Sequence, residues 1–439
     1  MPEDDEVAGD GRDRAGVADS AAPTRDEYGV GRLLALSDGV FAVAMTLLIV
    51  NLNVPPAPAH ATSAEGLRAL QHQLRALGIF AFSYVMVSVY WLNHHRGLRR
   101  LRVANRGVLF RNLWLLCLVC LMPFVTAFFQ RFSNTTAGNQ VYLGALFLLA
   151  LLSALTVPWR EQAETAAREP GGRRRVAAIY LRQVGDLPVF ALGFVLAFWV
   201  PGDAALVVLC LIVLVGLTGL ILVRGLREPL PDPDPYGVGR MLALSDDVFA
   251  IALTLLVLNV GVSEIGATGN QAALALLGRE RSRLVAFVIT FAVIGIYWTA
   301  HHRALRSVTS VRDNIMRRNL VILFAICLVP FVMDFFDAWN DTVFGNQFFF
   351  AAIGIIGALI WLFGPGAARM RAGLRGGWRE ARPVASVIVA GGAVPVSLLG
   401  IVLAPLLGPG NVQLVWLLMA PMVVVERILS GEAPRAGAR

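Results

Sequence analysis

Two short runs in this chain place an arginine, a serine and an aspartate at the start of an apolar stretch. The first run, RLLALSDGVFAVAMTLLIVNL, begins at Arg32, and the second, RMLALSDDVFAIALTLLVLNV, begins at Arg240. Each has about 20 residues, which is long enough to cross a bilayer as a helix. Charged groups beside a membrane-spanning helix are costly and usually functional. A duplicated, charged spanning helix therefore indicates a protein that moves something, most simply ions, across a membrane.

The charged groups at the start of these helices need partners on other helices. Arg32 and Asp38 are six residues apart, about 240° around a helix, so they cannot form the usual pair between residues four apart. Polar residues at the end of the next apolar stretch and at the start of the third would lie at the same membrane depth. We therefore predict one network in each half of the chain: Arg32, Ser37, Asp38, His94 or His95, and Asn112; then Arg240, Ser245, Asp246, His301 or His302, and Asn319.

Such a network has two interpretations. Because histidine titrates near physiological pH, the network could sense protons or gate a pathway. Alternatively, it clamps three helices together, since buried charges need pairing and hydrogen bonds, and we favour the clamp. Adjacent histidines such as His94 and His95 point about 100° apart on a helix, which argues against a zinc site. No metal site or cofactor is expected.

The apolar part of each first helix has an uncharged face. In steps of about 100° per residue, this face holds Val43, Leu47 and Val50 with Thr46 at its edge, and in the second half Ile251, Leu255 and Leu258 with Thr254. Packed around an axis, the face would form a narrow hydrophobic constriction, which can gate by dewetting. Spacing alone favours the simpler alternative, a buried helix face.

One turn before this face, the two halves differ. Gly39 lies four residues before Val43, and Asp247 lies four residues before Ile251. If the face lines a pore, both positions lie at its inner mouth, where acidic side chains favour cations. The alternative is an ion pair of Asp247 with Arg240 or Arg303.

The two halves match well beyond these helices. YWLNHHRGLR from Tyr90 returns as YWTAHHRALR from Tyr297, and RNLWLLCLVCLMPF from Arg111 returns as RNLVILFAICLVPF from Arg318. Matching blocks in register indicate an internal repeat. We predict an all-α integral membrane protein with two six-helix repeats and 12 transmembrane helices, near 33–54, 76–95, 109–130, 139–158, 176–200, 204–224, 241–262, 284–302, 318–337, 347–364, 383–404 and 412–430. The predicted domains are a disordered tail at 1–28, the first repeat at 29–224, a linker at 225–239, the second repeat at 240–430 and a tail at 431–439.

Composition and charge agree with this assignment. The chain is 56% hydrophobic and 15% charged, whereas soluble domains carry about 25% charge. The net charge of +8 comes from arginines clustered between apolar stretches, so it reports topology and not nucleic-acid binding. The positive-inside rule then places both termini in the cytoplasm. Six is an even number, so the repeats have the same orientation and are related by a pseudo-symmetry axis along the membrane normal.

The motif, with the Y-W-x-x-H-H and R-N…P-F blocks, resembles the transmembrane protein 175 family of cation channels, from about Arg32 to the last span. The resemblance implies six-helix units, a homodimer for chains with two repeats, and a potassium-permeable channel whose first helices line the pore. Carried over, the narrowest layer falls on Val43 and Ile251, with Thr46 and Thr254 one turn outward. The motif phenylalanine is replaced by Leu36 and Leu244, a departure from the family pattern. The expected partners are permeant K⁺, other monovalent cations or protons, membrane lipids and a second copy of the chain.

Two other classes remain open from the residues. A secondary transporter of the major facilitator type also has two parallel six-helix halves, and Arg182 and Asp186 would be its best midplane candidates. A non-conducting membrane scaffold is the other alternative. An enzyme is not expected, because no nucleophile with a base and no carboxylate pair recurs in the spans. The lysine-free, arginine- and alanine-rich composition indicates a bacterial plasma membrane.

Overall fold

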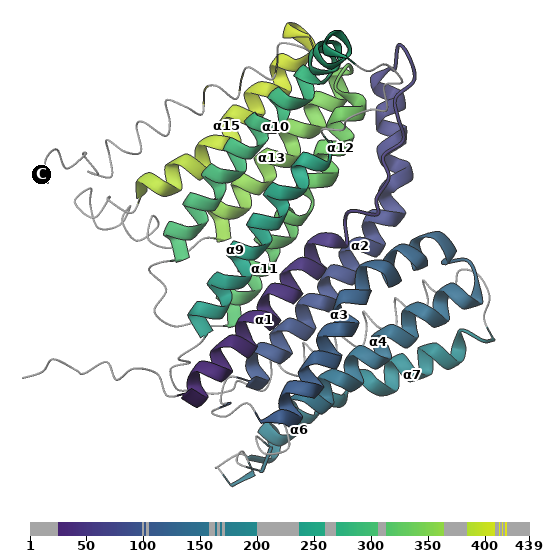
Figure 1. The fold of residues 1–439 in the computed structure, drawn as a ribbon, viewed down its shortest axis with the longest axis vertical. Coiled ribbons are helices and arrows are strands. Elements are labelled where there is room, and N and C mark those ends of the chain that lie inside the picture. Colours follow the sequence, from purple (N-terminus) through teal and green to yellow (C-terminus); the bar gives the residue numbers. More distant parts are fainter. Residues whose placement is uncertain are drawn as a thin grey trace, which may run out of the picture.

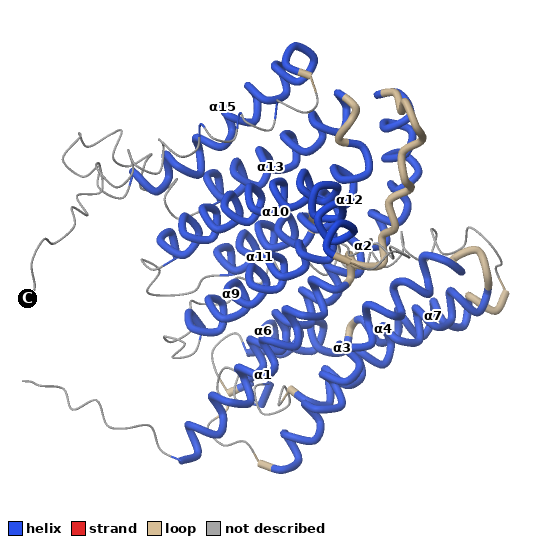
Figure 2. Tube along the Cα trace, turned by 45° about the horizontal axis from the view of Figure 1, so that its top comes forward, coloured by secondary structure: helices blue, strands red, loops and turns tan. Residues whose placement is uncertain are grey.

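The structure is a computed structural model, and every structural statement below concerns the residues that it describes. They are 25–98, 101, 105–157, 163–164, 167–168, 172–199, 237–259, 269–305, 313–363, 384–408 and the single positions 412, 415 and 418. Within these ranges all regular elements are helices, joined by loops (Figure 2). Eight helical stretches are long and apolar enough to cross a membrane. The chain is therefore an all-helical membrane protein.

The helices form two groups that follow the two repeats (Figure 1). The first group contains α1 (Arg25–Leu47), α2 (Ser63–Leu98), α3 (Arg106–Phe132), α4 (Thr136–Thr156), α6 (Gly172–Val184) and α7 (Asp186–Leu196). The second contains α9 (Gly237–Leu255), the short 3-10 helix η1 (Leu256–Asn259), α10 (Asn270–Leu305), α11 (Asp313–Cys327), α12 (Val329–Trp339), α13 (Val343–Phe363) and α15 (Val384–Leu407).

Most predicted spans coincide with a helix, although several boundaries differ. The predicted span at 204–224 and nearly all of that at 412–430 lie outside the described residues, as do residues 225–236 of the linker. α1 begins at Arg25, inside the predicted disordered tail, and ends at Leu47, earlier than predicted. After Leu47 the chain continues in turns, with the Val50 N–H donating to the Leu47 carbonyl at 3.2 Å. Pro55, Pro56 and Pro58 then disfavour a return to helix, because proline disfavours helix both at its own position and at the residue before it.

Two predicted spans are divided. The fifth consists of α6 and α7, which meet at Gly185. In the second repeat the third span consists of α11 and α12, with Pro330 at the start of α12. Proline has no N–H to donate to the carbonyl four residues earlier, here that of Ile326, so the helix is interrupted. The equivalent Pro123 lies within the continuous helix α3.

Local sequence sets the starts of the helices around the site. Asn105 caps α3 by accepting a hydrogen bond from the Val108 N–H at 2.9 Å. Thr62 and Glu65 form a reciprocal capping box before α2: the Thr62 N–H donates to Glu65 Oε2 at 2.8 Å, and the Glu65 N–H donates to Thr62 Oγ1 at 3.3 Å. These caps fix where α2 and α3 begin, and so set the position of their inward-facing residues.

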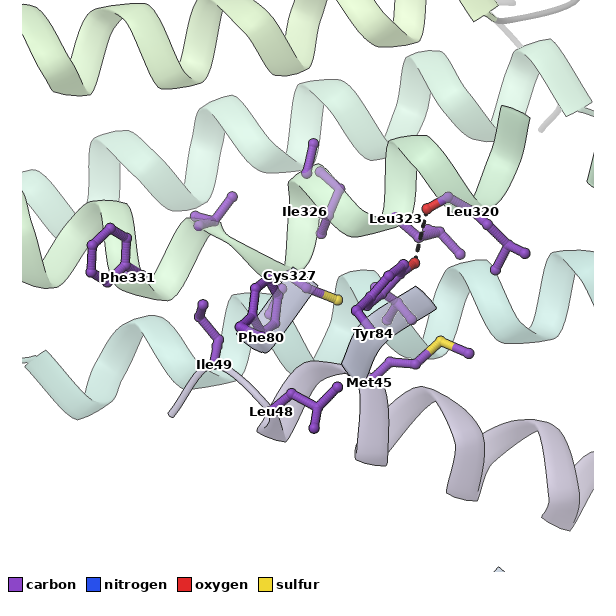
Figure 3. Packing of buried hydrophobic residues seen from close by; sticks show 14 of the residues in the cluster. Met45, Leu48, Ile49, Phe80, Tyr84, Leu320, Leu323, Ile326, Cys327 and Phe331 are labelled. Atoms are coloured by element: carbon purple, nitrogen blue, oxygen red, sulfur yellow. Dashed lines mark hydrogen bonds between the residues drawn. The ribbon is translucent and has the colours of Figure 1, made fainter. Parts of the chain in front are cut away.

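The repeats pack against each other along an apolar surface that we call the in-chain seam (Figure 3). The Tyr84 hydroxyl of α2 crosses this surface and donates to the Leu320 carbonyl of α11 at 2.9 Å. Phe80 stacks on Phe324 with ring centroids 5.5 Å apart. The seam consists of Met45, Leu48, Ile49, Phe80 and Tyr84 from the first repeat and Leu320, Leu323, Ile326, Cys327 and Phe331 from the second, all of them buried.

A second contact joins the repeats at the far end of α2, which reaches toward α12 (Figure 1). The Trp339 indole N–H donates to the Pro55 carbonyl at 3.2 Å, and the Phe344 N–H donates to Ser63 Oγ at 3.2 Å. At Gly66 an added Cβ would lie 3.1 Å from the Trp339 ring. The missing side chain therefore permits a close approach, which holds the beginning of α2 against the second repeat.

Candidate functional site

The first network lies where the N-terminal half of α1 meets the end of α2 and the start of α3. Asn112 of α3 is fully buried, and its Nδ2 donates to Ser37 Oγ at 3.0 Å. Its Oδ1 lies 2.8 Å from His94 Nε2. Ser37 Oγ in turn donates to the Leu33 carbonyl at 2.8 Å. One buried asparagine thus connects all three helices.

Asp38 is the anionic centre of this network. It is buried, and its Oδ1 accepts a hydrogen bond from the Trp91 indole N–H at 2.9 Å. Its cationic partner is Arg240 on α9, in the other repeat. Arg240 Nη2 lies 2.7 Å from Asp38 Oδ1, and Arg240 Nε lies 2.9 Å from Oδ2. This two-point contact is the strong arginine–carboxylate geometry.

The contacts of Arg240 fix the protonation state of His94. Arg240 Nη2 also lies 3.1 Å from His94 Nδ1. A guanidinium has only donors, so Nδ1 must accept, and Nε2 then carries the hydrogen that Asn112 Oδ1 receives. A doubly protonated ring would place two donors face to face. The arrangement therefore holds His94 as the neutral ring.

The second repeat reproduces the side-chain bonds without the arginine. His301 Nε2 lies 2.8 Å from Asn319 Oδ1, and Asn319 Nδ2 donates to Ser245 Oγ at 2.9 Å. The Trp298 indole N–H donates to Asp246 Oδ1 at 2.8 Å. Among the described residues, no arginine pairs with Asp246. In the described residues, the second network therefore has the same side-chain bonds as the first network but lacks the arginine that pairs with the aspartate.

The prediction that each arginine joins its own repeat differs from the structure. Arg240 crosses to Asp38 of the first repeat, and the Arg32 side chain is exposed without a hydrogen-bond or ion-pair partner in the described part of the chain. The physical reason is the spacing itself, because six residues place arginine and aspartate on different sides of one helix. Arg240 of α9 therefore pairs with the aspartate of α1, the first helix of the other repeat, and not with the aspartate of its own helix.

The structure separates the roles of the paired histidines, which the sequence left open. His94 and His301 bond to the asparagines, whereas His95 and His302 lie against the indole rings of Trp91 and Trp298, with centroids 5.3 and 5.2 Å apart. The two tryptophans were missed as network members. Their signal was present, since Y-W precedes each H-H pair and a buried indole N–H usually needs an acceptor.

The predicted pore-face residues remain partly open in the chain. Val43 is 41% exposed and Val50 is 43% exposed, although both are apolar residues of a packed helix. Leu47, Ile251 and Leu255 are partly exposed, and the Leu258 side chain lies outside the described residues.

The two predicted threonines differ in their surroundings. Thr46 is buried, and its hydroxyl donates to the carbonyls of Ala42 and Val43 at 2.9 Å. Thr254 is exposed, and its hydroxyl donates to the Ile251 carbonyl at 2.8 Å. Within one chain, therefore, Thr46 does not share the open face that Val43 presents, whereas Thr254 is accessible beside Ile251.

Gly39 and Asp247 lie together where α1 and α9 pack against each other. A Cβ added to Gly39 would be 3.6 Å from Asp247 Oδ2. Asp247 is partly exposed, and no arginine of the described residues makes an ion pair with it. The alternative pairing with Arg240 is therefore not what the structure contains, since Arg240 bonds to Asp38.

The candidate residues of a transporter are placed differently from the expectation. Arg182 belongs to α6, and its side chain lies outside the described residues. Asp186 is the first residue of α7, after the break at Gly185. Arg182 and Asp186 therefore belong to two different helices, although both lie within the span predicted at 176–200.

Comparisons with known proteins agree with the sequence resemblance. The family model described as "Endosomal/lysosomal potassium channel TMEM175" matches residues 32–123 and 240–330, one region at the start of each repeat. A Streptomyces collinus protein named as a potassium channel is 31% identical over 129 residues, which cover 28% of this chain and 59% of that protein. The endosomal/lysosomal proton channel TMEM175 of Gallus gallus is 22% identical over 329 residues, 68% of this chain and 65% of that one.

A solved structure is also similar. It is the crystal structure of a lysosomal potassium-selective channel TMEM175 homologue from Chamaesiphon minutus, at 25% identity and a TM-score of 0.37, covering 44% of this chain and 98% of that chain. Both sequence relatives are matched over less than two thirds of their own length. The two family matches contain the arginine–serine–aspartate motif, the paired histidines and the asparagine of each network. The chain is thus similar to the TMEM175 family over two regions, one at the start of each repeat, which together make up less than half of its length.

Proposed function

We propose that this protein is a potassium-permeable cation channel whose pore is lined by the first helix of each repeat, α1 and α9. The observation that carries the proposal is the open apolar face of these two helices. α1 and α9 pack side by side, and Val43 is exposed and Ile251 partly exposed, although both are apolar residues of packed helices. The potassium-channel name of the Streptomyces relative supports the same function.

The proposed channel is a homodimer in a bacterial plasma membrane. Two six-helix repeats in the same orientation would give 12 spans per chain, with both termini in the cytoplasm. Two chains then place four first-type helices around one axis along the membrane normal. The motif networks lie at the cytoplasmic ends of these helices and hold them to α2, α3, α10 and α11. Their role in this proposal is a clamp that fixes the angle of each pore helix.

Conduction is controlled by hydration at the apolar layers. Rings formed by Val43 with Ile251, and by Leu47 with Leu255, would lose water when narrow and conduct when wetted. Asp247, with Gly39 beside it, would lie at the cytoplasmic mouth. Two carboxylates there would raise the local cation concentration, because low-dielectric walls concentrate the field of a charge.

Purified protein in liposomes tests this function directly. We expect K⁺ flux above that of empty liposomes, with Na⁺ and proton fluxes measured on the same preparation. The matched control is the double variant Val43→Trp and Ile251→Trp, whose large rings would fill the narrowest layer and suppress the flux. Absence of K⁺ flux from a folded preparation, or full flux in the double variant, would contradict the proposal.

A further inference from the structure

A group of polar side chains lies inside the first repeat, and its helices α4 and α7 are on the far side of that repeat from α9 (Figure 1 and Figure 2). Gln183 Nε2 of α6 donates to Ser153 Oγ of α4 at 3.3 Å. Tyr90 of α2 lies close enough to Asp186 of α7 for the carboxylate to act electrostatically on the tyrosine hydroxyl. Gly185 has helical backbone angles, so Gln183 and Asp186, three residues apart, share one side of the chain. The four side chains therefore form one group, which we call the junction cluster.

Two oxygens of the junction cluster have no hydrogen-bond partner among the described residues. They are the Tyr90 hydroxyl and Gln183 Oε1, on side chains that are 3% and 5% exposed. Asp186 is partly exposed, and no arginine or histidine of the described residues pairs with it. Buried polar atoms are almost always paired, since an unpaired one is costly. The cluster therefore has the composition of a site that binds something between its oxygens.

The junction of α6 and α7 adds a backbone oxygen to this cluster. α6 ends at Val184, and α7 begins at Asp186. Pro188 has no N–H, so the Val184 carbonyl four residues earlier has no helical hydrogen bond. The last carbonyls of a helix carry partial negative charge. In membrane transporters, carbonyls at such helix interruptions coordinate Na⁺, so the junction favours a cation.

The second repeat has a different arrangement at the equivalent positions. Tyr297, the equivalent of Tyr90, donates its hydroxyl hydrogen to the Ile353 carbonyl at 2.9 Å. The alignment that matches Pro188 with Pro395 places apolar residues at the other three positions: Ile360 for Ser153, Ala390 for Gln183 and Ala393 for Asp186. α15 also continues past Pro395 without an interruption. The polar side chains and the helix junction thus occur together in one repeat, so the fold common to both repeats does not require them.

We propose that Tyr90, Gln183 and Asp186 bind a monovalent alkali cation, Na⁺ or K⁺, at the junction of α6 and α7. The ligands are a carboxylate, a hydroxyl, an amide oxygen and the Val184 carbonyl, and hard cations prefer oxygen ligands. One carboxylate balances one positive charge, which leaves the site neutral where a net charge is costly. Because Asp186 is partly exposed, an ion can reach the buried oxygens behind it.

Three other arrangements would satisfy part of the same cluster. A water molecule would bridge Tyr90 and Gln183, but it would leave the Asp186 charge uncompensated. A protonated Asp186 would bond directly to its neighbours, whereas neither the Tyr90 hydroxyl nor Gln183 Oε1 has such a bond. An ion pair between Asp186 and Arg182 would supply the charge from within the chain. None of the three depends on which alkali cation is present, and this difference separates them from the proposal.

The melting temperature of the purified protein in different salts tests the site. The protein is unfolded in detergent in NaCl, in KCl and in the chloride of N-methyl-D-glucamine, a cation too large for the cluster, at equal ionic strength. We expect Na⁺ or K⁺ to raise the melting temperature by about 2 °C or more, because a ligand that binds only the folded state stabilises it. Equal melting temperatures in the three salts would overturn the proposal.

Two variants assign the effect to the junction cluster. Asp186→Ala, which introduces the residue of the second repeat, should abolish the difference between the salts. Tyr90→Phe should reduce that difference, and in N-methyl-D-glucamine it should melt no lower than the wild type, because it removes an unpartnered hydroxyl. A difference between salts that persists in Asp186→Ala would place the ion elsewhere, for example in the pore, and would overturn the proposal.

The matched control is Tyr142→Phe, whose hydroxyl lies 2.7 Å from Ser83 Oγ, outside the junction cluster. We expect it to lower the melting temperature equally in all three salts and to keep the full difference between them. If Asp186→Ala does not fold, Tyr90→Phe and Gln183→Ala replace it. An equal effect of these two variants in every salt would show a purely structural role and would contradict cation binding.

Discussion

Asp38 and Asp246 occupy equivalent positions in the two repeats, but among the described residues only Asp38 pairs with an arginine. Substituting each aspartate should therefore affect stability to a different extent. We expect Asp38→Asn to lower the free energy of unfolding by about 3–5 kcal/mol, because it leaves the buried Arg240 without its counter-ion. Asp246→Asn should cost less, since the Asp246 carboxylate is only partly buried and pairs with no arginine among the described residues. Thermal unfolding in detergent measures both. Equal melting temperatures for the two variants would contradict this difference.

At the mouth of the proposed pore, the relevant residue is Asp247. We expect Asp247→Asn to lower cation flux from the cytoplasmic side, most clearly at low ionic strength, because salt screens the attraction of a carboxylate for cations. The control is Asp341→Asn, an exposed aspartate between α12 and α13, which should leave the flux unchanged. An equal loss at high and low salt would indicate a structural role for Asp247.

Residue identities predicted much of the network. The sequence placed Ser37, Asp38, Asn112 and a histidine at one depth. In the structure Asn112 bonds to Ser37 and His94, whereas Asp38 is joined to His94 only through Arg240. The sequence could not choose between the adjacent histidines, because both lie at the end of the same helix and only the rotation of that helix decides. It could not assign Arg240 to Asp38 either, since that contact depends on how the two repeats pack.

At the scale of elements, the open faces of α1 and α9 lead to a prediction about hydration. We expect the double variant Val43→Asn and Ile251→Asn to raise cation flux, because a polar ring stays hydrated where an apolar ring dewets. Flux into liposomes measures the change. Val85→Asn, at an exposed apolar position of α2, is the control for a general effect of asparagine in the membrane. Unchanged flux in a folded double variant would place the pore elsewhere.

Helix positions were easier to predict than helix ends. The apolar stretches predicted the positions of α3, α4 and α13 closely, because an apolar run of about 20 residues is best explained as a membrane-spanning helix. The N-terminal part of α2, before its apolar half, was not predicted as helix. α2 has 36 residues, about 54 Å at the helical rise, so it exceeds the bilayer core. Its first turn is held by the other repeat, through the Phe344 N–H bond to Ser63 and the close approach of Gly66 to Trp339, which hydropathy does not report.

For the whole molecule, we expect a particle that contains two copies of the 47.4 kDa chain. The reason is that each chain supplies two first helices, α1 and α9, and two chains would place four of them around one axis. Native mass measurement in mild detergent checks the copy number, with the detergent removed before the mass is read. A particle of one chain, or of four full chains, would contradict the dimer.

The arrangement of the repeats was predictable only in part. The regular offset between matching blocks indicated two similar halves, and the family comparison matches each of them. The interruptions at Gly185 and between α11 and α12 were not predicted, since Pro123 and Pro330 occupy equivalent positions and only one of them interrupts its helix. Whether the proline interrupts its helix depends on how the surrounding helices pack, and the sequence of a single span does not show that packing.

The buried bonds that begin at Arg240 all point in one direction, through His94, Asn112 and Ser37 to the Leu33 carbonyl. A proton travels along such a chain only if every member can take up one proton and release another. The guanidinium at one end does not give up its protons, the asparagine amide does not exchange them readily, and the carbonyl at the other end has none to pass on. The network is thus a proton insulator, and in the proposed channel a proton would need a route outside it, such as water along the pore.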